Sequence, residues 1–136
     1  MCFLKIHSKN HTFKKFCETT KTPVYSVFDK GEYRNKNKTR KSETFVISFD
    51  VSDAEWDDFP TQAKDAIKFL TEHFSELNSL ISGIPDANGY LDFPLYSRLN
   101  EEVVNQNDHL PKELISLAGK LNLGIEMATY SQEAFE

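Results

Sequence analysis

The sequence predicts a single-domain α+β fold, a ferredoxin-like sandwich whose mixed or antiparallel sheet carries one long helix and shorter helices packed on one face. Three observations lead to this class. Apolar residues recur at helical spacing over residues 59–82, several short segments alternate apolar with polar residues, and the two kinds of segment alternate along the chain. With 136 residues, 39% of them hydrophobic, the chain can build one core, so residues 1–136 are expected to form one domain.

The first half of the chain predicts three strands and a short helix. Leu4 and Ile6 alternate with polar neighbours, which is typical of a half-buried strand. A short helix is expected over residues 11–20 and a short strand over residues 25–28. Residues 44–51 place Phe, Ile, Phe and Val at every second position and predict a further strand.

Residues 59–82 predict one long helix with a single apolar stripe. Asp57 and Asp58 precede it as candidate caps, Pro60 suits its first turn, and Gly83 follows as a stop. The stripe needs a flat partner, and a sheet provides one. Its members, spaced by three and four residues, are Ala63, Ala66, Ile67, Leu70, Phe74, Leu77 and Ile81.

The second half of the chain predicts a strand, a short helix and a last strand. Residues 90–96 alternate, but Pro94 cannot donate a ladder hydrogen bond, so this segment is expected to be an edge or bulged strand that could pair two copies of the chain. Pro111 opens a short amphipathic helix, and residues 123–128 alternate again. Monomer and homodimer both stay open at this point.

The charge is distributed unevenly along the chain. Residues 1–41 contain 11 Lys or Arg and three acids, whereas the rest of the chain is strongly acidic and the whole carries a net charge of −5. A basic run lies between two predicted strands, and we expect it to form a hairpin arm on which Lys36, Lys38 and Arg40 share one face. The candidate partner-binding residues are Lys30, Arg34, Lys36, Lys38, Arg40, Lys41 and, as an interface anchor if it is exposed, Trp56.

No motif predicts catalytic residues, a cofactor or a metal. His7, His11, Cys2 and Cys17 are metal-ligand types, but their spacing forms neither CxxC nor HExxH. The glycines form no GxGxxG, and no serine lies in a GxSxG elbow. Two cysteines without a disulfide framework, no signal peptide and no apolar stretch of membrane-spanning length favour a cytoplasmic protein that does not contact membrane.

Dispersed segments between Pro23 and Tyr130 resemble small bacterial proteins of the domain of unknown function 4279 type. The resemblance implies a compact α+β domain of this length, and it brings no catalytic residues. The segments are Pro23 with Tyr25 to Arg34, Phe49 to Trp56, Gln62, Ala66, Phe69 and Leu70, Leu91 to Phe93, Leu110-Pro111, Leu114, Leu117 to Gly119, and Leu123 to Tyr130.

These observations favour a small non-enzymatic protein-binding module whose basic arm docks on an acidic protein partner. An immunity-type inhibitor is one concrete form of such a module. The alternatives are an enzyme or small-molecule binding module with a pocket that the sequence does not disclose, and a weak nucleic-acid binder. Nucleic acid is disfavoured because the pI is about 5.4 and the acidic part of the chain repels phosphate. A solvated loop whose lysines prevent strand-edge pairing is the structural alternative for the arm.

Overall fold

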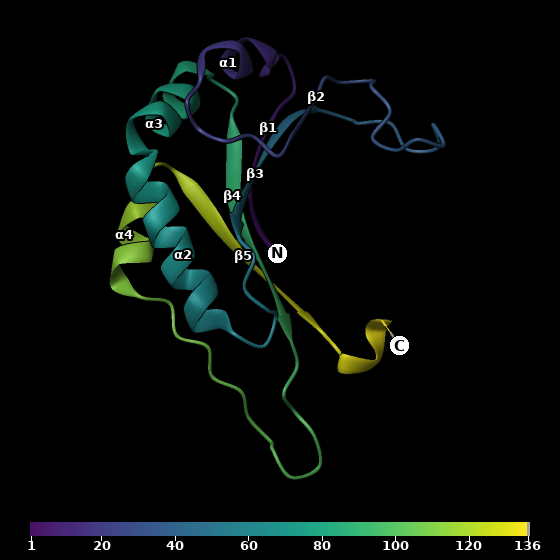
Figure 1. Cartoon of the computed structure of the whole chain (residues 1–136), viewed down its shortest axis with the longest axis vertical. Helices are drawn as coiled ribbons and strands as arrows, with labels where there is room; N and C mark the ends of the chain where they lie inside the picture. The colour runs from purple at the N-terminus through teal and green to yellow at the C-terminus, as the bar shows by residue number, and fades with distance from the viewer. Residues whose placement is uncertain (136) are drawn as a thin grey trace.

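A five-stranded mixed sheet organises the protein, whose computed structural model describes residues 1–135 (Figure 1). The strand order is β2-β3-β1-β4-β5. Antiparallel ladders join β2 to β3, β3 to β1 and β1 to β4, whereas β5 runs parallel to β4. The predicted single α+β domain with a mixed sheet is therefore confirmed. The strands are β1 (Cys2–Ser8), β2 (Ser26–Phe28), β3 (Phe45–Ser52), β4 (Asn88–Tyr96) and β5 (Leu123–Tyr130).

The helices cover one face of the sheet. Figure 1 shows α2, α3 and α4 along the same side, and α1 joins them because the Phe16 ring packs edge-on against Phe49 of β3, with the ring centroids 6.4 Å apart. Among residues 1–135, no α-helix packs on the opposite face. The helices are α1 (Lys14–Thr19), α2 (Phe59–Glu72), α3 (Phe74–Gly83), α4 (Lys112–Lys120) and a terminal 3-10 turn, η1 (Gln132–Phe135).

Alternation along β1 separates the two faces. Leu4 and Ile6 are 0% exposed beneath the helices, whereas Phe3, Lys5 and His7 are half-buried on the uncovered face. The two antiparallel neighbours follow the same alternation, since paired residues point to the same side of a sheet. We call the side that carries Phe3, Lys5 and His7 the open face.

The prediction of one long helix over residues 59–82 is not confirmed, because the segment divides at His73 into α2 and α3. The His73 backbone leaves the helical region (φ −111°, ψ 16°), and its ring packs against Phe69 with the centroids 4.7 Å apart. Its Nδ1 also lies 3.3 Å from the Thr22 hydroxyl. The apolar spacing continues through this single residue, which is why the periodicity alone predicts no break.

Residues 90–96 belong to an interior strand, not to the edge strand that Pro94 predicts. Strand β4 pairs with β1 on one side and β5 on the other, so it is not an edge strand of the sheet. The β1 ladder ends at Asp92, and the missing N–H of Pro94 therefore removes no bond to β1. The Pro94 carbonyl instead accepts a hydrogen bond from Gln62 Nε2 of α2 at 3.1 Å.

We predict that Gly89→Ala destabilises the fold by about 1–3 kcal/mol, because overpacking a filled core costs that much. An added Cβ would lie 2.6 Å from Leu123 Cδ2 and 3.2 Å from Ile6 Cγ1. Chemical denaturation gives the free energy of unfolding. Gly119→Ala in α4 is the control, since its added Cβ meets no heavy atom within 4 Å. Equal stability of the two variants would contradict the close packing of β1, β4 and β5.

Candidate functional site

The basic arm, which we define as residues 29–44, joins β2 to β3 as a short hairpin. It contains one isolated bridge, between Tyr33 and Lys41, and the Arg34 N–H donates to the Arg40 carbonyl at 2.7 Å. The flanking strands do not extend through it, so the predicted period-two face of Lys36, Lys38 and Arg40 does not form.

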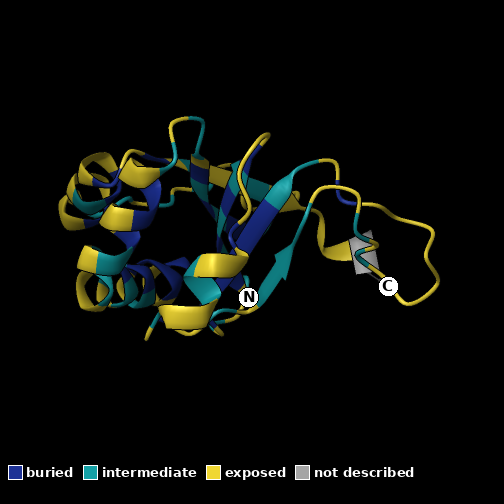
Figure 2. Ribbon diagram, turned by 90° about the horizontal axis from the view of Figure 1, so that it is seen from above, coloured by how far each residue is buried: buried dark blue, intermediate teal, exposed yellow. Residues whose placement is uncertain are grey.

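A turn built on Asn35 closes the tip of the basic arm. The Asn35 side-chain oxygen accepts hydrogen bonds from the backbone N–H groups of Thr39 at 3.1 Å and Arg40 at 3.2 Å. Its amide nitrogen donates to the Thr39 hydroxyl at 2.6 Å. Lys38 takes a positive φ of 54° within the turn. Asn is a favoured turn residue because its side chain can replace backbone partners in this way. Figures 1 and 2 show the arm extending away from the body of the protein, with its ribbon mostly exposed.

The base of the basic arm is fixed to α1. Glu32 Oε1 accepts from the Asp29 N–H at 2.8 Å and pairs with Lys14 Nζ at 2.5 Å. Lys14 also reaches Asp29 Oδ2 at 3.5 Å. The Lys14 hydrogen bond lowers the pKa of Glu32 below its ordinary value. Asp29 and Glu32 are therefore engaged by a lysine of α1, and Glu43, the remaining acid of the arm, forms no ion pair with an arm cation among residues 1–135.

The six arm cations have no carboxylate partner within the described residues 1–135. None of their charged nitrogens lies within 4.0 Å of an Asp or Glu oxygen in that range. Two of them lie over aromatic rings: the Arg34 guanidinium is 5.5 Å from the Phe28 centroid, and Lys41 Nζ is 5.3 Å from the Tyr33 centroid. These six are Lys30, Arg34, Lys36, Lys38, Arg40 and Lys41.

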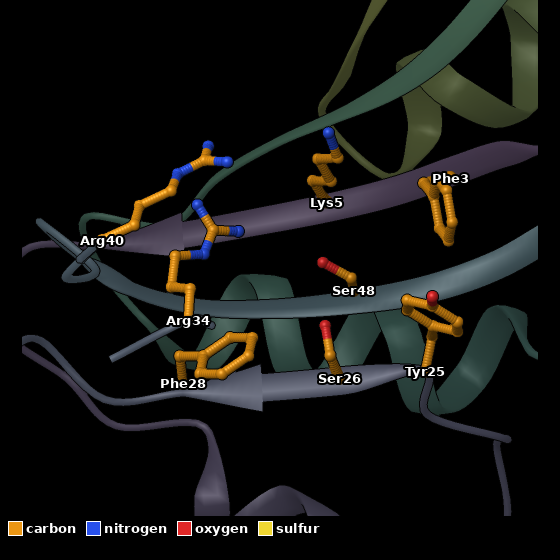
Figure 3. A pocket seen from close by; sticks show the side chains of 8 residues that line it. All are labelled: Phe3, Lys5, Tyr25, Ser26, Phe28, Arg34, Arg40 and Ser48. Carbon is orange, nitrogen blue, oxygen red and sulfur yellow. The ribbon is translucent and has the colours of Figure 1, made fainter. Parts of the chain in front are cut away.

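A hollow of about 490 Å³ lies where the arm base meets the open face of β1, β2 and β3 (Figure 3). We call it the arm-base hollow. At one end the guanidinium groups of Arg34 and Arg40 point into the same space, and at the other end lie the rings of Phe3 and Tyr25. Its remaining lining residues are Lys5, Ser26, Phe28 and Ser48.

Only part of the predicted site comes together. Arg34 and Arg40 converge on the arm-base hollow, whereas Trp56 lies at the other end of the sheet. Trp56 is half-buried, its ring stacks on Tyr130 with centroids 5.2 Å apart, and its carbonyl accepts from the Tyr96 N–H at 3.0 Å. Its ring contacts Tyr96 and Tyr130, and it does not line the arm-base hollow. Trp56 therefore belongs to an aromatic cluster with Tyr96 and Tyr130 that includes none of the six arm cations.

Sequence reasoning missed the aromatic and hydroxyl residues of the hollow. The available signal was the polar side of the strand patterns, because Phe3 and Lys5 alternate with core residues and must face away from the helices. Tyr25 and Ser48 join them only through long-range strand pairing, in which the Tyr25 N–H donates to the Ser48 carbonyl at 2.8 Å. This pairing is not visible in the local pattern.

Neither a metal centre nor a membrane span is found in the part of the chain that the structure describes. Over residues 1–135 no three His, Cys, Asp or Glu side chains gather closely enough to hold a metal ion. In the same range no helix combines the length and the hydropathy needed to cross a bilayer. Cys2 is a buried thiol and its burial raises its pKa, whereas Cys17 is half-buried.

Comparison with known proteins gives no match to a family model, to a curated protein or to a solved structure. The resemblance to the domain of unknown function 4279 type stays a prediction.

We predict that acidification loosens the base of the basic arm. The folded-state pKa of Glu32 lies below its ordinary value of 4.5, so its stabilisation is complete above that value and is lost as the pH falls through the lowered folded-state pKa. Glu32→Gln should produce the same loosening at pH 7. Backbone NMR order parameters over residues 31–42 should fall from about 0.85 toward 0.6. Glu101→Gln, on an exposed loop, is the control, and an arm that stays rigid in Glu32→Gln would contradict this anchor.

Proposed function

We propose that this chain is a small binding module without enzymatic activity, which recognises an acidic surface of a protein partner through the basic arm. An immunity-type inhibitor is one form that this activity could take. The observation that supports the proposal is the surplus charge of the arm: six cations on a projecting hairpin without a carboxylate partner among residues 1–135. An acidic partner surface would supply the missing anions.

The geometry of the arm suits rapid recognition. A projecting cluster of one sign attracts an oppositely charged surface over a distance, which raises the association rate more than the final affinity. The Asn35 turn and the Lys14–Glu32 pair hold the arm in one shape before binding. A preorganised arm loses less conformational freedom when it binds, and this favours affinity.

A small-molecule binding module is the second candidate function. The arm-base hollow favours it, since converging polar and aromatic side chains are typical of ligand sites. Binding of nucleic acid has less support, because the open face also carries Asp50, Asp92 and Glu126, which are in register across β3, β4 and β5.

We also infer a ferredoxin-like arrangement and a cytoplasmic location. The order β2-β3-β1-β4 with antiparallel neighbours, connected by α1 and α2–α3, supports a βαββαβ unit to which α4 and β5 are added. The free thiols of Cys2 and Cys17 support a reducing compartment.

We predict that Lys36→Glu/Lys38→Glu abolishes capture of the protein partner. The double reversal changes the charge at the arm tip by four units, while both side chains are exposed, so the free energy of unfolding should change by no more than about 0.5 kcal/mol. Cross-linking in cells that express the protein naturally would identify the partner by mass spectrometry. Calorimetry on the purified pair should then show that affinity falls as salt concentration rises.

Lys64→Glu/Lys112→Glu is the matched control. It makes the same change of net charge at exposed positions of α2 and α4, away from the arm, and should leave the affinity within a few fold of wild type. Equal affinity of wild type and Lys36→Glu/Lys38→Glu would refute the role of the arm tip.

A further inference from the structure

We propose that the arm-base hollow binds a free nucleoside phosphate, with the phosphate between Arg34 and Arg40 and the base against Phe3 and Tyr25. This site is distinct from the arm tip, and the proposal does not depend on a protein partner binding there. Four features of the structure lead to it.

The first feature is a pair of like charges. Arg34 and Arg40 lie one step beyond the Tyr33–Lys41 bridge, joined by the hydrogen bond from the Arg34 N–H to the Arg40 carbonyl, so their side chains leave the arm directly opposite each other. Like charges at opposed positions destabilise a two-stranded ribbon. The neighbouring pair is complementary by contrast, since Lys41 lies over the Tyr33 ring. A bound anion would turn the repulsive pair into a favourable one.

The second feature is the orientation of the two guanidinium groups. Figure 3 shows both of them directed into the same part of the arm-base hollow, and the Arg34 group is held over the Phe28 ring at 5.5 Å. Guanidinium groups donate paired hydrogen bonds that match phosphate oxygens. A phosphate monoester carries a charge of about −1.5 to −2 at pH 7, which balances two guanidinium groups, whereas one carboxylate balances only one.

The third feature is the aromatic end of the hollow. The Phe3 and Tyr25 rings pack with centroids 4.9 Å apart, and yet Tyr25 remains 58% exposed. A planar base can stack on such a surface. Between the two ends, Ser26 and Ser48 are paired across β2 and β3, and both line the hollow. These hydroxyls could bond the hydroxyl groups of a sugar that links base and phosphate.

The fourth feature limits the length of the ligand. Asp50 and Asp92 flank Phe3 in register on both sides, and Glu126 follows Asp92. Lys5 is already paired with Asp92 at 3.3 Å. Phosphates that continued past the aromatic end would meet this row of carboxylates and be repelled. The volume of about 490 Å³ also lies in the range of about 300–1,000 Å³ that small ligands occupy. A free nucleotide therefore fits better than a nucleic-acid strand.

Titration calorimetry with AMP, adenosine and ribose 5-phosphate tests the proposal on the purified full chain. AMP should bind, and each fragment should bind about tenfold more weakly or worse, because each lacks one end of the ligand. In NMR spectra, AMP should shift the amide signals of Phe3, Tyr25, Ser26 and Ser48. The proposal is wrong if none of the four nucleotides AMP, GMP, CMP and UMP binds at millimolar concentration.

Two variants and a matched control locate the site. Arg34→Gln/Arg40→Gln and, separately, Tyr25→Ala should each weaken AMP binding by about tenfold or more. Lys36→Gln/Lys38→Gln makes the same charge change as the arginine double variant at the arm tip, outside the hollow, and should bind AMP as wild type does.

Two results would overturn the assignment. An equal loss in the lysine control would mean that the arm attracts anions without a defined site, and tighter binding of a uridine octamer than of UMP would mean that the ligand is a nucleic-acid strand. Because no protein partner takes part, failure of this experiment is distinct from failure of the Lys36→Glu/Lys38→Glu experiment.

Discussion

Apolar side chains of three strands pack against the helices on one face of the sheet, and this one-sided packing determines what the other face can present. Leu4, Ile6, Phe49 and Leu91 are fully buried on the helix side. Burying each such side chain contributes about 1.5–3 kcal/mol. A slip of one residue in the β1 register would move Lys5 and its neighbours into the core, so the packing that stabilises the fold also fixes the positions of the open-face side chains.

The strands and the helical spacing could be predicted from the sequence because each rests on a local period. The division of the helix at His73 could not be predicted in this way. His73 contacts Phe69, which is near it along the helix, and Thr22, which is distant in the sequence, and a local period does not reveal the distant contact. The place of β4 was missed for a related reason. Pro94 costs a ladder hydrogen bond only where a neighbouring strand would accept one from its backbone. Only the tertiary structure shows that the ladder with β1 has already ended before Pro94.

The candidate site shows the same limit. The composition of the basic arm could be predicted, but the pairing of Arg34 with Arg40 depends on the register that the Asn35 turn imposes. Had the strands continued through the arm, other residues would have faced the hollow. The convergence of Phe3 with Tyr25 requires two segments that are distant in the sequence, and only the pairing of β1, β3 and β2 brings them together. The local sequence patterns therefore predicted the positive charge of the basic arm, but not which residues converge on the arm-base hollow.

The strand order converts the uneven charge of the sequence into an uneven charge in space. Strand β2 and most of the basic arm come from the basic first 41 residues and lie at one edge of the sheet, while β5, with Glu126, lies at the other edge. The Lys5–Asp92 pair lies between the two regions. At physiological ionic strength, charges are screened over about 8 Å, a distance of fewer than two strand spacings. The arm therefore presents a positive surface to its surroundings even though the whole chain has a net charge of −5. The net charge is consequently a poor guide to what this protein binds, and the local charge at the β2 edge is the relevant quantity.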